Sequence, residues 1–119
     1  MGYSIADIEE LPGEGPSGRV RKLRRALGAR AFGFNYFTLP PHAEGVEHDH
    51  ADGEQEEVMF VVKGSGWLRV DDAEVELRAG RFVRIDPEAV RRPVAGQDGL
   101  EFLTIGAPLH GAYEPPEWG

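Results

Sequence analysis

The stretch GVEHDHADGEQEEVMFVVKG (Gly45–Gly64) places two histidines, a run of carboxylates and a short apolar segment between two glycines. His48 and His50 are two residues apart, so on an extended strand both side chains face the same side. Imidazole binds Zn, Fe, Ni, Cu and Mn, and a nearby carboxylate can complete such a site. Taken alone, this spacing is more typical of polar surface, so a metal site and a solvated acidic loop are both open interpretations.

The segments on either side of this stretch have the pattern of short β-strands. Apolar and β-branched residues alternate with polar ones, and glycine-, proline- or aspartate-rich turns such as KGSG, DDAE, RAG, DPEA and GQDG separate the segments. The predicted strands are residues 31–39, 58–62, 67–70, 75–77, 81–85, 91–94 and 100–106. Short strands at nearly regular spacing are typical of a β-sandwich or β-barrel. We therefore expect an all-β fold.

The length of 119 residues is sufficient for one compact domain and too small for two ordinary ones. Residues 1–18 are polar and end in PGEGPSG, so we expect an N-terminal arm there and a single domain over residues 19–119. The basic run Arg19–Arg30 carries apolar positions at Val20, Leu23 and Leu27 that fit a helical stripe. A basic run of this kind is more often a solvated face than a nucleic-acid site.

Charge and composition disfavour several classes of function. The net charge of -8 would repel a phosphate backbone, so no nucleic-acid partner is expected. The sequence has no cysteine, so His, Asp, Glu or water must hold any metal. The N-terminus lacks the features of a signal peptide, and no segment has the length and apolarity of a membrane span. We expect a cytoplasmic protein without a membrane partner.

The stretch Gly45–Gly64 also resembles the first motif of the cupin family, G-x5-H-x-H-x3-4-E-x6-G, with Glu57 six residues before the closing glycine. The segment GRFVRIDPEAVRRPVAG (residues 80–96) resembles the family's second motif at Gly80 and Pro87, with one extra residue. Together the similarity covers residues 31–105. It implies a double-stranded β-helix, the jelly-roll barrel of the cupins, with a pocket for metal or substrate inside the barrel.

This resemblance implies that His48, His50 and Glu57 are ligands of a divalent metal ion, for which Zn, Mn, Ni and Fe are candidates. The spacing departs from the family at several points. Glu54 fits the usual distance from His50, but only Glu57 has the usual distance to Gly64. Since a loop can lengthen while a strand fixes side-chain direction, Glu57 is the predicted ligand.

The position at which the second motif has its metal-binding histidine is Arg92, counted from Pro87. Arginine stays protonated and is no ordinary metal ligand. Arg92 would weaken a metal site, pair with Glu57, or bind the carboxylate or phosphate of a small ligand. Alternatively, Arg91 and Arg92 both face solvent. His42 is a candidate replacement ligand, and His110, in the irregular tail, a weaker one.

Two classes of function follow from these residues. The first is a metal-dependent enzyme such as an oxygenase, an isomerase or a lyase, which acts on a small polar or aromatic metabolite. The second is a metal-free module that binds a small molecule or acts as a dimeric sensor. In either case Arg92, Phe34 and Tyr36 are the predicted substrate-binding residues, because some strand aromatics must line the mouth of a barrel.

The apolar strand after the acidic stretch indicates a homodimer. If Glu57 points into the barrel, Val58, Phe60 and Val62 point outward, because side chains alternate along a strand. An exposed apolar strip of this kind needs cover, and a second subunit is its usual source.

Overall fold

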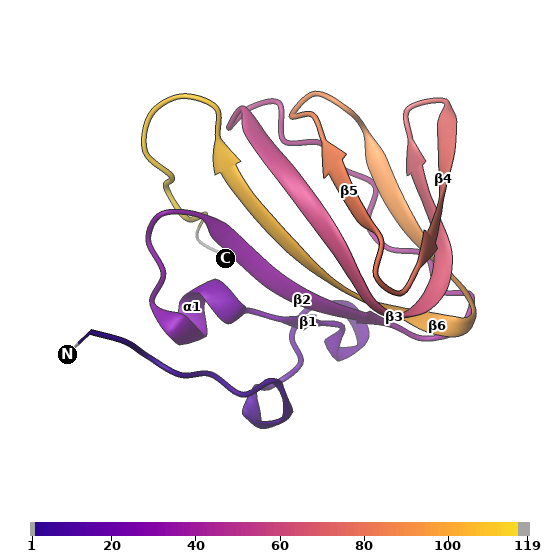
Figure 1. Ribbon diagram of the computed structural model, residues 1–119, viewed down its shortest axis with the longest axis horizontal. Helices are drawn as coiled ribbons and strands as arrows, with labels where there is room; N and C mark the ends of the chain where they lie inside the picture. Colours follow the sequence, from indigo (N-terminus) through magenta and orange to yellow (C-terminus); the bar gives the residue numbers. More distant parts are fainter. Residues whose placement is uncertain (1, 117–119) are drawn as a thin grey trace.

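Six β-strands form from the alternating segments, and the computed structural model, which describes residues 2–116, joins them into one antiparallel sheet (Figure 1). The strands are β1 (Val20–Arg21), β2 (Gly33–Leu39), β3 (Gln55–Val70), β4 (Ala73–Arg78), β5 (Phe82–Ile85) and β6 (Arg91–Pro108). Their order is β1-β2-β6-β3-β4, and β5 pairs with β3. The sheet curls into a jelly-roll barrel, which confirms the predicted all-β fold class.

The long strands β3 and β6 correct two predicted turns. The segments KGSG (residues 63–66) and GQDG (residues 96–99) lie inside β3 and β6, which pair along almost their whole length. The register shifts between Val61 and Lys63 and again between Gly64 and Gly66. The shifts mark irregularities of the bulge type, which bend a strand without ending it.

Two glycines of β3 allow the backbones of β3 and β6 to approach each other closely at this bend. Gly64 has a φ of 85°, and a methyl group on its Cα would overlap the carbonyl oxygen of Gly99. A methyl group on Gly66 would overlap the carbonyl oxygen of Val94. Both β3 and β6 therefore run from one half of the barrel into the other, where β4 replaces β5 as the neighbour of β3.

Side chains along β3 alternate between the inside and the outside of the barrel. Met59 and Val61 are buried, whereas Val58 and Val62 are about 40% exposed (37% and 42%). This confirms the predicted direction of each face. The buried core is Leu39, Met59, Val61, Leu68, Leu77, Ile85, Ala89, Ala95, Leu100 and Phe102. Burying a large apolar side chain of this kind contributes about 1.5–3 kcal/mol, so this layer dominates the stability of the barrel.

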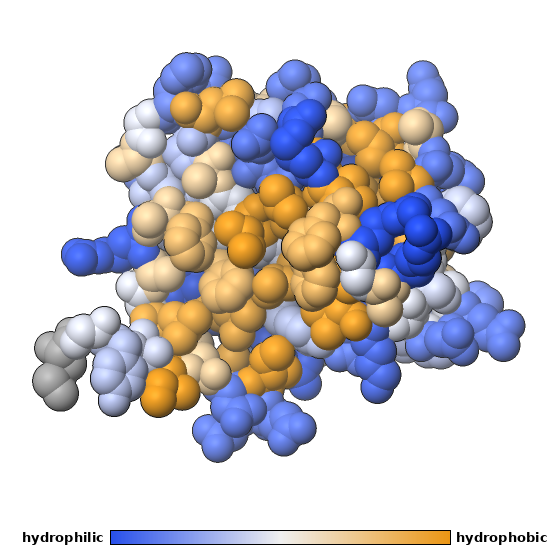
Figure 2. Space-filling model, viewed as in Figure 1, coloured by the Kyte–Doolittle hydropathy of each residue, from blue (hydrophilic) through white to orange (hydrophobic). Residues whose placement is uncertain are grey.

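The outer face of β3, β5 and β6 is apolar. Figure 2 shows a band of apolar residues across the middle of this face, with polar residues around it. Val58 pairs with Ile105 of β6, and Phe60 pairs with Phe82 of β5, so these side chains share the outer side. The rings of Phe60 and Phe82 lie 4.4 Å apart, and Phe82 is 67% exposed. Phe82 therefore lies on the exposed side of the sheet and not in the core.

The N-terminal segment contains two 3-10 turns, η1 (Ile8–Glu10) and η2 (Pro16–Gly18), and the short helix α1 (Leu23–Leu27). The predicted helical stripe is confirmed only for Leu23 and Leu27, because Val20 belongs to β1. None of the helices in residues 2–116 is both long enough and apolar enough to cross a membrane. The cytoplasmic location stays a prediction.

The segment before β1 lies against the barrel. Glu14 and Val20 exchange backbone hydrogen bonds, and Val20 is paired with Phe37 of β2. The boundary at residue 18 stays a prediction, but η2 is held beside the sheet by these contacts.

Candidate functional site

The loop that carries the two histidines runs beside β6 and is hydrogen-bonded to it. His48 and Arg91 exchange backbone hydrogen bonds of 3.0 and 2.9 Å, and the backbone N–H of His50 donates to the carbonyl of Pro87. The side-chain Nδ1 of His48 lies 3.1 Å from the carbonyl oxygen of Val46. This contact orients the ring and leaves Nε2 as the nitrogen with a free lone pair, the usual arrangement of a metal-binding histidine.

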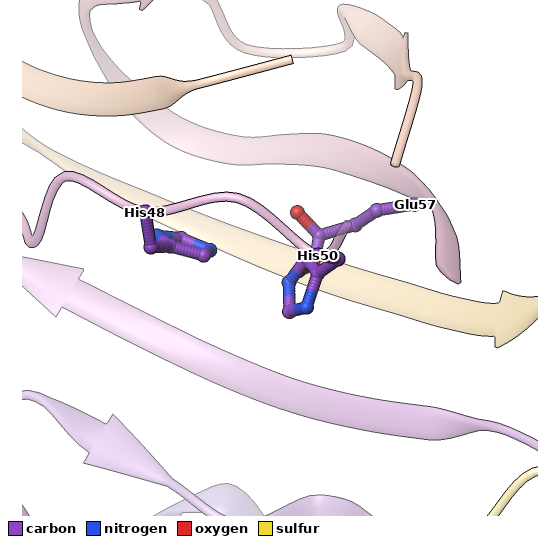
Figure 3. Close-up of side chains that lie close together, drawn as sticks. All are labelled: His48, His50 and Glu57. Atoms are coloured by element: carbon purple, nitrogen blue, oxygen red, sulfur yellow. Dashed lines mark ion pairs between the residues drawn. The ribbon is translucent and has the colours of Figure 1, made fainter. Parts of the chain in front are cut away.

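Glu57 comes from β3, and its side chain lies beside His50 (Figure 3). The Nε2 of His50 and the Oε2 of Glu57 are 3.3 Å apart. The rings of His48 and His50 are nearly perpendicular, with centroids 5.0 Å apart. One ligand atom from each of the three residues lies within 4.8 Å of the others. The structure therefore brings together the three residues that the sequence singles out.

These three donors fit a transition metal. Bonds of about 2.1 Å at a tetrahedral angle put two ligand atoms about 3.4 Å apart, which agrees with the separation of His50 and Glu57. The three ligand atoms lie within 4.8 Å of one another, so at least part of the group is wider than this tetrahedral spacing. Two imidazoles and one carboxylate leave coordination positions open for water or substrate.

Two other acids in the same stretch do not join the group. Glu54 lies in a turn with a φ of 49°, and Glu56 forms an ion pair with Arg84 on the surface. Among the residues that the structure describes, His42 and His110 also stay outside the group. His42 has a φ of 63° and bonds to Gly96 through its backbone N–H.

Arg91, and not Arg92, lies against Glu57. The side chain of Arg91 is 1% exposed, and its Nη2 is 3.4 Å from Oε1 of Glu57. Its Nη1 donates to the carbonyl of Ala89 at 2.7 Å. The interpretation that both arginines face solvent is therefore wrong. Arg92 makes no contact with Glu57; its Nε donates to the carbonyl of Gly45 and its Nη2 pairs with Glu44.

The register of β6 explains this difference. The motif position was assigned to Arg92 by counting residues from Pro87. Pro87 lies in the turn at residues 86–89, where side chains do not alternate as they do in a strand. Arg91 pairs with Val70, and Arg92 with Arg69, so the two arginines have opposite directions as successive residues of a strand. One guanidinium thus lies beside the candidate metal group, and its positive charge opposes a cation there.

The carboxyl group of Glu57 is held in its charged form. Burial alone would raise its pKa, but the hydrogen bond and charge of His50, with the charges of Arg91 and His48, lower the pKa below its ordinary value. A carboxyl group with a depressed pKa in the folded state stabilises the fold above its unfolded pKa. This contribution is lost as the pH falls through the lower, folded pKa.

We therefore expect the free energy of unfolding of the metal-free protein to decrease as the pH falls below about 4.5, the ordinary value for a glutamate. The matched control is Glu57→Gln, which keeps the shape and cannot titrate. Urea unfolding at several pH values should show a gap between the two proteins at neutral pH that narrows in acid. A constant gap would contradict the depressed pKa.

Two adjoining cavities meet at this group. The first has a volume of about 450 Å³ and the second about 640 Å³, and both are lined by His48 and Glu57. Pro16 and Val20 of the N-terminal segment and Phe37 of β2 also line both of them. A volume of this size fits a small molecule. The candidate metal group thus lies where a ligand could reach it.

Comparison with known proteins identifies the family of this barrel. A family model described as a cupin domain matches residues 35–106. The chain is a member of the cupin family. Solved structures show the same fold. A cupin protein from Bacteroides fragilis has a TM-score of 0.77 at 23% identity, over 98% of this chain and 92% of that one.

Two further structures resemble this cupin at the level of the fold. A predicted oxalate decarboxylase from Thermotoga maritima has a TM-score of 0.75 at 20% identity, over 89% of this chain and all of that one. A sugar phosphate isomerase from Silicibacter pomeroyi has a TM-score of 0.72 at 24% identity, over 87% and 75%. No curated protein matches the sequence.

The predicted substrate-binding residues of the cupin have different positions. Arg92 lines the smaller cavity, and Phe34 lines the larger one. Tyr36 lines neither, because it pairs with Leu103 and shares the outer side of the sheet with Phe60. Its hydroxyl donates to Glu101 at 2.8 Å. Burial and this bond raise the pKa of Tyr36 to about 12.

Three residues of the cupin site were not predicted as site residues from the sequence. Arg19 and Phe37 line the smaller cavity, and Arg91 contacts Glu57. Alternation along residues 31–39 singles out Phe32, Phe34 and Tyr36 as the aromatic face. That face is the outer one, and Phe37 points inward with Asn35 and Leu39. Phe37 breaks the alternation of the other three aromatics, and this break could have indicated that it points inward.

Proposed function

We propose that this cupin binds a divalent transition metal through His48, His50 and Glu57 and uses it to act on a small metabolite held in the adjoining cavities. The observation that carries the proposal is the convergence of one ligand atom from each residue within 4.8 Å, beside a cavity of about 450 Å³. A metal at this position would supply a Lewis acid with open coordination positions.

The residues of the chain have defined tasks in this proposal. The contact between Val46 and Nδ1 of His48 orients one imidazole, and β3 fixes the direction of Glu57. Phe37 and Met59 provide an apolar wall that reduces the access of water. An oxygenase, an isomerase and a lyase are each compatible with three protein ligands. The three solved structures named above, which are 20–24% identical, support the fold and do not choose among the reactions.

Calorimetric titration with Zn, Mn, Ni and Fe(II), the last without oxygen, tests the metal site. We expect binding of modest affinity that weakens in acid, because metal ligands must be deprotonated and protons compete with the metal. His50→Ala should lose at least about tenfold in affinity, because even the loss of a hydrogen-bond partner of a ligand costs about 10–100-fold. His42→Ala, a loop histidine outside the group, is the matched control. A wild-type protein that binds none of the four metals would refute the proposal.

One observation favours a metal-free binding module instead. Glu57 already has two partners, since Oε1 is 3.4 Å from Arg91 and Oε2 is 3.3 Å from His50. The carboxylate is thus satisfied without a cation, and Arg91, rather than the predicted Arg92, takes the place of a metal. Retained binding of a small molecule by a protein that binds no metal would select this alternative.

We further propose that the outer apolar face is the interface of a homodimer. The face contains Val58, Phe60 and Val62 of β3, together with the exposed Phe82 and Ile105. An apolar band of this kind on a sheet is typical of contact between two copies.

Phe60→Glu is therefore expected to convert the dimer into a monomer, because each copy would place a charge in the apolar contact. Sedimentation equilibrium at micromolar concentration is the measurement. Tyr3→Glu, which changes an exposed aromatic outside the sheet, is the control and should leave the mass unchanged. A wild-type monomer, or a Phe60→Glu dimer of unchanged strength, would exclude this interface.

A further inference from the structure

Two arginines from distant parts of the chain line the smaller cavity. Arg19 precedes β1, and Arg92 belongs to β6. Nη1 of Arg19 donates to the carbonyl of Glu44 at 3.1 Å, and Nε of Arg92 donates to the carbonyl of Gly45 at 3.0 Å. These carbonyls are on adjacent residues, and both arginines line the same cavity. We call Arg19 and Arg92 the arginine pair.

The charge of the arginine pair is only partly compensated. Within the part of the chain that the structure describes, Arg19 makes no ion pair with a carboxylate, and its buried Nε has no hydrogen-bond partner. Arg92 has Glu44 at 3.5 Å, but that carboxylate is 45% exposed and also contacts Arg69 at 3.5 Å. An anion that enters the cavity would therefore meet two cations with donors to offer.

The rest of this cavity is mainly apolar. Phe37 and Phe102 are stacked with ring centroids 4.9 Å apart, and Leu39 and Met59 line the same wall. His48 and Glu57 of the candidate metal group belong to the same cavity. One molecule in this space could thus contact the arginine pair, the aromatic wall and the metal group.

We propose that the ligand is a small monocarboxylic acid with an apolar or aromatic body, and that the arginine pair binds its carboxylate. The carboxylate accepts hydrogen bonds from Arg19 and Arg92, the body lies against Phe37 and Phe102, and the other end faces His48 and Glu57. The inference deepens the proposed function and rests on it only for the place at which the ligand would react.

The side chains that line the smaller cavity favour a monocarboxylic acid over a phosphate ester or a sugar. Positive and negative side chains around the cavity are balanced, namely Arg19, Arg91 and Arg92 against Glu44, Glu47 and Glu57. Such a balance suits one negative charge better than the two of a phosphate ester. A sugar would leave several hydroxyl groups against Phe37, Phe102 and Met59 without partners, at a cost in binding. An apolar acid avoids both problems.

Phenylacetate, its neutral analogue phenylacetamide and the dianion phenyl phosphate are the probes. Calorimetry on the wild-type protein should show phenylacetate binding at least about tenfold tighter than the other two, as loss of a charge-assisted contact implies. This comparison needs no variant. Equal binding of phenylacetate and phenylacetamide would overturn the proposal, as would absence of phenylacetate binding at millimolar concentration. Tighter binding of phenyl phosphate would show that the carboxylate assignment is wrong.

Variants then test the residues. Arg19→Met and Arg92→Met should each weaken phenylacetate binding by about tenfold and leave phenylacetamide binding unchanged. Arg69→Met is the matched control, since Arg69 also contacts Glu44 but lines neither cavity. Arg19→Lys and Arg92→Lys, which keep the charge and lose the planar fork, serve if a Met variant unfolds. Unchanged affinity in the arginine variants would refute the arginine pair.

The experiment separates this inference from the metal proposal when it is run both after chelation and with Zn. Phenylacetate binding that depends on Arg19 in a protein that binds no metal supports the inference while the metal proposal fails. A protein that binds Zn but not phenylacetate keeps the metal proposal and overturns the inference.

Discussion

Arg91→Met is expected to destabilise the metal-free protein by about 3 kcal/mol, because it removes the partner of a buried carboxylate. Arg91 is 1% exposed, and Glu57, which it contacts, has 13% of its side chain exposed. The loss should appear in urea unfolding at neutral pH. Arg92→Met is the matched control one residue away. Its ion pair with Glu44 is partly exposed, with side chains 35% and 45% accessible, so we expect a change of about 1 kcal/mol or less.

The same variant should gain affinity for metal. Without the guanidinium, a divalent cation becomes the natural partner of Glu57, and the repulsion that Arg91 exerts disappears. At a free metal concentration 100 times the Kd, binding restores about 2.7 kcal/mol of stability. Unfolding curves with and without Zn should therefore differ more for Arg91→Met than for the wild type. Equal shifts in both proteins would show that Arg91 does not control metal binding.

Gly64→Ala is the second large change. We expect a loss of about 3 kcal/mol, from left-handed backbone strain together with an overlap that β3 and β6 cannot relieve separately. The added methyl group would meet the backbone of Gly99 and Leu100 and not a mobile side chain. Thermal or urea unfolding measures the loss.

Gly80→Ala isolates the contribution of the overlap. Gly80 has a φ of 90°, close to that of Gly64, but an added methyl group there has nothing within 4 Å. It should lose only about 1 kcal/mol, the cost of the left-handed conformation alone. If the two variants lose the same amount, the crossing of β3 and β6 has room that the structure does not show.

The sequence was sufficient for the parts of the fold that depend on alternation. The faces of β3 follow from the choice of Glu57 as an inward residue, and buried Met59 and Val61 agree with it. It failed at Lys63–Gly66, where a glycine-rich segment has the composition of a turn. In this barrel the same glycines allow two strands to bend together, and only the partner strand decides between these outcomes.

Some residues of the candidate site could likewise be predicted from the sequence, and others could not. The grouping of His48, His50 and Glu57 could be expected from local spacing along one segment. The role of Arg91 could not, because the phase of β6 is set after the turn at residues 86–89. The place of Arg19 in the cavity wall could not be predicted for another reason. It is 73 positions from Arg92, and no pattern in the sequence connects a residue before β1 with the wall of a cavity built by β2, β3 and β6.

The order of strands also governs how the chain can fold. β2 and β3 do not pair with each other, since β6 lies between them and bonds to both. Until residues 91–108 arrive, both strands have open edges, and their apolar faces have no partner across the sheet. Closure then depends on contacts between residues 61–73 positions apart, such as Phe34 with Ile105. Such non-local topology favours slow folding, with amide protons in all three strands gaining protection together and late.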